Sequence, residues 1–191
     1  MPCGLFTALP PEIQFSTIIS PQVIFTSESE RASMASQTVA NELYFEDFEV
    51  GDTFVSPGRT ITETDIVNFA CLTGDFNPLH VDHEFAANTP FGKPIAHGLL
   101  GLSYMAGIGS SSPVVKTAAF VGIRNWKFAK PIFAGDTIRV ETEVAEKQQS
   151  GRRRGRVVWK RRVLNQHDEV VQEGELETLV MCAFTRPLQP R

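Results

Sequence analysis

One segment constrains the fold more than any other. Residues His97 to Ile108 carry apolar and small side chains on every side of a helix, including three glycines. A helix without a polar face has to be buried. The apolar stretch around it, Ile95 to Gly109, is shorter than the roughly 20 residues that cross a bilayer. Protein rather than lipid must therefore cover this helix.

The second half of the chain supplies strands for that cover. Ile138, Val140 and Val144 alternate with charged residues, which is the pattern of a half-buried strand. Four strands are predicted: Ala118–Phe128, Thr137–Lys147, Gly155–Asn165 and Val170–Ala183. With one strand before the helices, this order predicts an α+β protein in which an antiparallel sheet wraps around the long central helix.

The segment before the apolar helix is predicted to hold that first strand and a second helix. Thr53–Ile61 has the pattern of a strand, and a capping box begins at Thr62. Apolar residues then follow at helical intervals up to Gly74, where the helix should end. Pro78 disfavours helical backbone at the residue before it, so Asp75–His80 is predicted to be a rigid loop.

The length of 191 residues suits one domain. Residues 1–41 are rich in Ser, Thr and Pro and show no sustained helical or strand period, which predicts a weakly ordered N-terminal extension. The single domain is predicted to span residues 42–184. Residues 185–191 should form a C-terminal tail.

Charge and cysteine content exclude several classes of function. Eighteen Lys and Arg against 22 Asp and Glu give a net charge of -4, whereas binding to nucleic acid needs an excess of basic residues. Neither nucleic acid nor a membrane is an expected partner. Three scattered cysteines form neither a disulfide framework nor a zinc pair, and no Lys or Arg precedes Arg31. Together these features predict a cytoplasmic protein.

A group of polar residues on the predicted loop carries the strongest sign of chemistry. Asp75, Asn77 and His80 lie within six residues, and His97-Gly98 follows 17 residues after His80. A carboxylate and an imidazole on one rigid loop can share a water molecule and move its proton. The N–H of Gly98, at a helix start, has no intrahelical partner and can stabilise an oxyanion. This combination suits the addition or removal of water beside an activated carbonyl.

These residues resemble a known family. Asp75-Phe-Asn-Pro-Leu-His80, Pro94-Ile-Ala-His-Gly-Leu-Leu100 and Lys130-Pro-Ile-Phe-Ala-Gly-Asp-Thr137 are similar to motifs of the MaoC-like, (R)-specific enoyl-CoA hydratases of the hotdog fold. The resemblance covers about residues 45 to 183. It implies a single hotdog domain, a homodimer or higher oligomer, and an enzyme of fatty acid metabolism that hydrates an enoyl-CoA or dehydrates a 3-hydroxyacyl-CoA.

The resemblance also implies roles for individual residues. Asp75 and His80 become the catalytic acid/base pair, and the Gly98 N–H becomes the donor to the thioester oxygen. Many members carry a serine eight residues after this glycine, where this chain has Ala106. The residues predicted to contact the substrate are Asn77, Phe76, His97 and Ser103. No metal or redox cofactor is expected, because CoA is part of the substrate.

Several interpretations of single motifs stay open at this point. Asp75 and Asn77-Pro78 are also common in turns and caps. His80 and His83 with Asp75 could be proposed as a metal site, although no helical zinc motif surrounds them. His97 could instead be a buried, hydrogen-bonded residue at the helix start. The arginine-rich stretch 152–162 is either a site for CoA phosphates or a solvated hairpin.

Two other functions compete with the hydratase. A hotdog thioesterase would direct water at the carbonyl instead of the β-carbon. A non-catalytic acyl-CoA-binding hotdog would not need the Asp75 and His80 pair. The length and branching of the acyl group, and the choice between CoA and acyl carrier protein, do not follow from the sequence.

Overall fold

The computed structural model of the chain describes residues 42–185. The predicted extension, 1–41, and residues 186–191 of the predicted tail lie outside the described residues. The helices in the described part are η1 (Phe45–Asp47), α2 (Glu63–Thr73), α3 (Pro78–Val81), α4 (His83–Ala87), α5 (Gly98–Gly109) and η2 (Ala183–Thr185). The strands are β1 (Thr53–Val55), β2 (Arg59–Thr60), β3 (Thr117–Phe128), β4 (Thr137–Ser150), β5 (Arg154–Leu164) and β6 (Val170–Met181).

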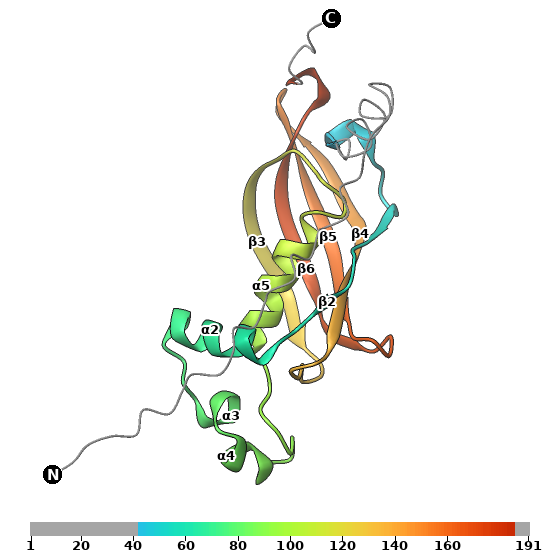
Figure 1. Cartoon of the computed structure of the whole chain (residues 1–191). Helices are drawn as coiled ribbons and strands as arrows, with labels where there is room; N and C mark the ends of the chain where they lie inside the picture. The colour runs from blue at the N-terminus through green and yellow to red at the C-terminus, as the bar shows by residue number, and fades with distance from the viewer. Residues whose placement is uncertain (1–41, 186–191) are drawn as a thin grey trace, which may run out of the picture. The chain divides into compact units, whose positions relative to one another are not determined.

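The six strands form one antiparallel sheet that curves around α5 (Figure 1). Its order is β1-β4-β5-β6-β3, and β2 pairs with β4. The four predicted late strands are confirmed, with ends that differ by at most three residues. The predicted alternation of buried and exposed residues along β4 is confirmed, because the side chains of Ile138, Val140 and Val144 are completely buried on the inner face.

The central helix α5 is covered on one side only, so the prediction of a helix buried on all sides is wrong for the single chain. Leu100, Gly101 and Met105 face the sheet and are buried. Leu99, by contrast, is 58% exposed, and Ser103 on the same open face is also exposed. The cause is geometric: one curved sheet can enclose roughly half of a helix, and α2 to α4 lie around the lower end of α5 (Figure 1).

The predicted strand Thr53–Ile61 is divided in two. Pro57 lies between β1 and β2 and has no N–H to donate to the ladder. Both halves pair with β4, and between them Ser56 also contacts this strand, since its Oγ accepts a hydrogen bond from the Val140 N–H at 2.8 Å.

The capping box of α2 is confirmed. The Asp65 N–H donates to the Thr62 side chain, and the Asp65 carboxylate accepts from the Thr62 N–H. Gly74 ends the helix in the left-handed conformation, with φ of 78°. None of the helices in residues 42–185 is long and apolar enough to cross a membrane. The cytoplasmic location stays a prediction.

Candidate active site

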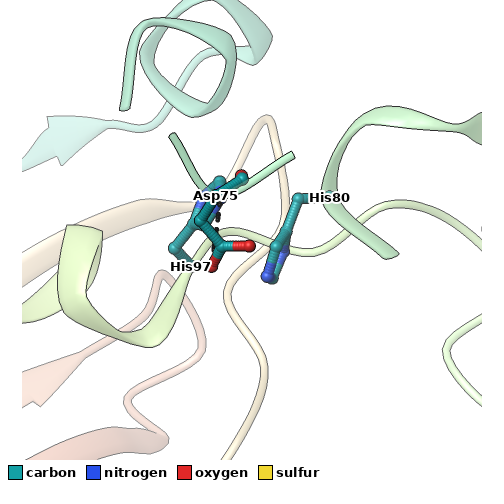
Figure 2. Close-up of side chains that lie close together, drawn as sticks. All are labelled: Asp75, His80 and His97. Carbon is teal, nitrogen blue, oxygen red and sulfur yellow. Dashed lines mark hydrogen bonds and ion pairs between the residues drawn. The ribbon is translucent and has the colours of Figure 1, made fainter. Parts of the chain in front are cut away.

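Three side chains that lie far apart in the sequence meet beside the start of α5. Asp75 follows the end of α2, His80 belongs to α3, and His97 immediately precedes α5. Figure 2 shows the Asp75 carboxylate next to both imidazole rings. One nitrogen or oxygen atom from each side chain lies within 4.8 Å of the others. The structure therefore brings together the predicted acid/base pair and adds His97 to it.

The predicted loop between Asp75 and His80 is partly helical, which corrects the prediction. Pro78 occupies the first position of α3, where a missing N–H removes no hydrogen bond. Asn77 caps this helix, because its Oδ1 accepts a hydrogen bond from the Leu79 N–H at 3.0 Å. Asp75 Oδ1 in turn accepts from the Asn77 N–H at 3.3 Å. Asn77 thus fixes the turn that carries His80.

The tautomer of His80 follows from its hydrogen bond. Its Nδ1 lies 2.7 Å from the carbonyl oxygen of Ile95, and a carbonyl oxygen can only accept. Nδ1 therefore carries a proton, and in the neutral ring Nε2 keeps a lone pair. The ring stacks on His97 with 3.8 Å between the ring centroids, which holds its orientation.

His97 has a supporting position. It is 3% exposed, and its Nε2–H donates to the backbone oxygen of Asp75 at 2.9 Å. The same nitrogen lies 3.9 Å from Asp75 Oδ2. Among the described residues, no group bonds to His97 Nδ1. His97 thereby fixes the backbone of one predicted catalytic residue and the ring of the other.

These bonds decide which atoms could hold a water or a metal ion. His97 Nε2, the nitrogen beside Asp75, is a donor and offers no lone pair, and the other ring nitrogen, Nδ1, is buried. The Asp75 carboxylate and His80 Nε2 remain. Two such atoms are enough to bind a water molecule but few for a metal ion. The alternative metal group with His83 does not form, because His83 Nε2 bonds to Glu63 Oε1 at 2.7 Å.

Gly98 begins α5 and lines a pocket of about 350 Å³. His80, Phe91, Phe128 and Ile132 are among its lining residues. A side chain at position 98 would crowd this space, because its Cβ would lie 3.0 Å from two ring atoms of Phe128. Among the hydrogen bonds of the described residues, none is donated by the Gly98 N–H.

The remaining predicted contact residues lie outside this pocket. The Phe76 side chain is 55% exposed and does not line it. Ser103 lies on the open face of α5, where its hydroxyl donates to the Leu99 carbonyl at 2.8 Å. Ala106, eight residues after Gly98, lines a different pocket near the end of α5.

Sequence reasoning missed Gln172, a strand residue that reaches the start of α5. Its side chain is 2% exposed, and its Nε2 donates to the Gly98 carbonyl at 3.0 Å. Its Oε1 accepts from Trp126 Nε1 at 3.3 Å. Gly101 in the apolar helix is the residue of the sequence that reflects this contact. A Cβ there would overlap the Gln172 amide and lie 2.8 Å from Ile132 Cδ1.

The arginine-rich stretch departs from the predicted solvated hairpin at Arg161, which is buried. On the outer face of β5, Arg162 pairs with Glu141 of β4, and Arg156 pairs with Glu177 of β6. Arg161 lies on the inner face, 8% exposed, so it belongs to no solvated hairpin. The alternation of the strand turns it inward between Trp159 and Val163.

Comparison with known proteins gives a consistent result along most of the described chain. The family model of the MaoC-like domain matches residues 47–166. Protein MaoC of Klebsiella aerogenes is 43% identical over 97 residues, which are 51% of this chain but 29% of that protein. A 3-hydroxybutyryl-CoA dehydratase of Methylorubrum extorquens is 40% identical over 133 residues, 70% of this chain and 81% of that protein.

A solved structure agrees with these sequences. The MaoC-like dehydratase of Rhodospirillum rubrum superimposes with a TM-score of 0.66 at 31% identity, covering 76% of this chain and 99% of that one. The predicted hotdog fold, an antiparallel sheet with a central helix, is confirmed. Since the family model covers more than half of the sequence, the chain belongs to the family of MaoC-like domains.

Proposed function

We propose that the chain adds water to an enoyl thioester, or removes it from the corresponding 3-hydroxyacyl thioester. The observation that carries this proposal is the convergence of two proton acceptors, the Asp75 carboxylate and the His80 ring, with one oxygen and one ring nitrogen within 4.8 Å of each other. His80 also lines the pocket that Gly98 opens. A water molecule held by Asp75 and His80 would face a thioester bound beside Gly98.

The proposed reaction needs only these groups. Both hydrogens of the water point to acceptors, so a lone pair on its oxygen faces C3 of the substrate. One acceptor takes a proton from the water as the oxygen bonds to C3. The electrons of the C2=C3 double bond shift toward the carbonyl, so negative charge forms on the thioester oxygen. The carbonyl double bond then re-forms as the electron pair returns to C2, which takes the proton from the protonated group. Addition from one side makes both new bonds on the same face.

The start of α5 stabilises the charge that forms on the thioester oxygen. The N–H of Gly98 is one of the unpartnered donors of a helix N-terminus, where the helix dipole also favours negative charge. The Ala96 N–H donates to the Ile132 carbonyl at 2.7 Å and so anchors the residues just before the helix. A donor that is fixed in advance costs no reorganisation during the reaction.

The names of relatives support the substrate class. The Methylorubrum protein is described as acting on 3-hydroxybutyryl-CoA. We extend this to the chain as an acyl thioester of CoA or of acyl carrier protein. The (R)-configuration at C3 is proposed from the (R)-specific enoyl-CoA hydratases of Aeromonas caviae and Rhodospirillum rubrum, which the chain also resembles. The mechanism calls for no metal or redox cofactor.

Product analysis separates this function from the alternatives. With crotonyl-CoA, hydration removes the enoyl absorbance without releasing thiol, whereas a thioesterase would release free CoA. Asp75→Asn and His80→Ala should each lower kcat/KM by about 10²- to 10⁴-fold with the fold retained. His83→Ala, which changes an exposed histidine on α4, is the matched control. Unchanged rates in the first two variants would favour a non-catalytic binder.

We also propose that two copies of the chain form a homodimer. The edge strand β3 exposes Phe120 and Val121, at 55% and 51%, and the open face of α5 exposes Leu99. A long apolar edge strand next to an uncovered helix is typical of a protein interface, and an antiparallel edge can pair with its own copy. Sedimentation should show a dimer that Leu99→Glu weakens. A wild-type monomer at micromolar concentration would contradict this proposal.

A further inference from the structure

A second pocket lies at the far end of α5 and shares no lining residue with the one beside His80. Its volume is about 220 Å³, and it is bounded by the end of α5, the start of β3 and the inner face of β5 and β6. Phe120, Trp159 and Leu176 make much of its wall apolar. Among the described residues that line it, Arg161 is the one that carries a charge.

Arg161 is unusual because it lies on the inner face of the sheet. Its side chain is 8% exposed, and its guanidinium group reaches the end of α5. Nη2 donates to the Gly109 carbonyl at 3.0 Å, while Nη1 donates to the Met105 carbonyl at 3.4 Å. Nη1 also lies 3.5 Å from the Met105 sulfur. These partners carry partial charges only.

In residues 42–185, no carboxylate pairs with Arg161. Its Nε has no hydrogen-bond partner there, and neither has the buried hydroxyl of Thr142, which lies opposite Arg161 in the register of β4 and β5. Burial without a counter-charge lowers the pKa of Arg161 to about 10. A buried charge normally has a counter-charge beside it, because the transfer of a charged group out of water costs several kcal/mol.

The helix is shaped to let the guanidinium approach. A Cβ at position 109 would overlap Arg161 Nη1 and would lie 2.8 Å from its Cζ, so the approach requires glycine. The three contacts named above leave some of the five guanidinium N–H donors without an acceptor. Donors of this planar group match the two oxygens of a carboxylate.

We propose that this pocket binds a carboxylate carried on a short apolar chain, with Arg161 as its charged partner. The apolar wall would cover the chain, and the carboxylate would supply the missing negative charge. Such a group has two sources. It could be the distal carboxylate of a dicarboxylic acyl thioester, or the carboxylate of a free acid that binds as an effector.

Calorimetric titration of the full chain with sodium hexanoate and with hexanamide tests the site without catalysis. The two probes share the apolar chain and differ in charge. Hexanoate should bind at least about tenfold more tightly than hexanamide, the effect of one charge-assisted hydrogen bond. Equal affinities, or no heat of binding from hexanoate at millimolar concentration, would overturn the proposal.

Two variants locate the binding. Arg161→Gln keeps hydrogen-bond donors for the helix carbonyls but removes the charge, and it should abolish the preference for hexanoate. Ala106→Leu fills the pocket from the helix side and leaves Arg161 in place, so it should weaken both probes. It also keeps the proposal testable if Arg161→Gln does not fold. Undiminished hexanoate binding in Ala106→Leu would place the ligand elsewhere and refute the proposal.

Kinetics then distinguish the two sources, and this step rests on the proposed hydratase activity. If the carboxylate belongs to the substrate, Arg161→Gln should lower kcat/KM at least about tenfold for an enoyl-CoA with a terminal carboxylate and spare the one with a terminal methyl. If it belongs to an effector, hexanoate should change the rate on the methyl substrate in the wild type but not in Arg161→Gln. Absence of both effects would refute a functional site, and absence of any hydration would instead refute the proposed function.

Discussion

The replacement Gln172→Leu tests whether a buried side chain positions the start of α5. Leucine has a similar volume, so the change leaves little cavity and mainly removes two hydrogen bonds. These are the bond from Gln172 Nε2 to the Gly98 carbonyl and the bond from Trp126 Nε1 to Gln172 Oε1. Trp126 is half-buried, so its N–H regains at most part of its hydration.

The cost follows from these two bonds. Leaving a buried donor or acceptor without a partner costs about 1–3 kcal/mol. Because the Gly98 carbonyl belongs to an exposed residue, its share should be near the lower end, and the total should be about 2–4 kcal/mol. At about 2–4 °C per kcal/mol for a domain of this size, the melting temperature should fall by several degrees. Thermal unfolding followed by circular dichroism measures this change, with exposed Gln148→Leu on β4 as the control.

A positioning role predicts more than a loss of stability. If Gln172 fixes the Gly98 peptide, Gln172→Leu should lower kcat by about 10- to 100-fold at temperatures where the protein is folded, with a smaller change in KM. Gln172→Glu separates the two bonds, since an ionised carboxylate can accept from Trp126 but cannot donate to Gly98. Its activity relative to the wild type should rise as the pH falls and the carboxyl gains a proton. A stability loss with unchanged kcat in both variants would refute the positioning role.

Two further predictions concern stability. Burial pushes the pKa of Asp65 up, but hydrogen bonds from Tyr104 and from Thr62 outweigh it and lower the pKa from 3.8 to about 2. The carboxylate therefore stabilises the fold above about pH 4, and this contribution is lost as the pH falls toward 2. Asp65→Asn should cost about 0.5–2 kcal/mol at pH 7 and flatten the pH dependence of the free energy of unfolding in that window. Gly155→Ala should destabilise by about 1–3 kcal/mol in urea unfolding, because its Cβ would lie 2.5 Å from Phe45 Cζ; an unchanged midpoint would contradict this packing.

Local sequence patterns predicted those parts of the fold that depend on neighbours in the chain. The capping box of α2 and the alternation along β4 each involve residues within a few positions, and both predictions are confirmed. The break at Pro57 and the helix that begins at Pro78 were not predicted. Proline has no N–H for a strand ladder, so it divides a strand, but at the first position of a helix that N–H is not needed.

The candidate site was predictable in its residue types but not in its tautomers. The spacing of Asp75, His80 and Gly98 pointed to acid/base chemistry with an oxyanion donor. The roles of the ring nitrogens depend on the Ile95 carbonyl and on the backbone of Asp75, which is 22 positions from His97. Such contacts are fixed by the tertiary fold and leave no periodic pattern in the sequence.

The glycines of α5 connect the central helix to both pockets. A glycine inside a helix costs roughly 0.5–1 kcal/mol relative to alanine, so several in one helix of twelve residues need a reason. Small size for packing is one reason, but the structure gives three of the four a distinct neighbour, Gly107 being the exception. Gly98 leaves the first pocket open beside Phe128, Gly101 admits the Gln172 amide, and Gly109 admits the Arg161 guanidinium. The apolar helix therefore does more than fill the sheet: its missing side chains let polar groups reach the helix backbone at both ends, next to the two pockets.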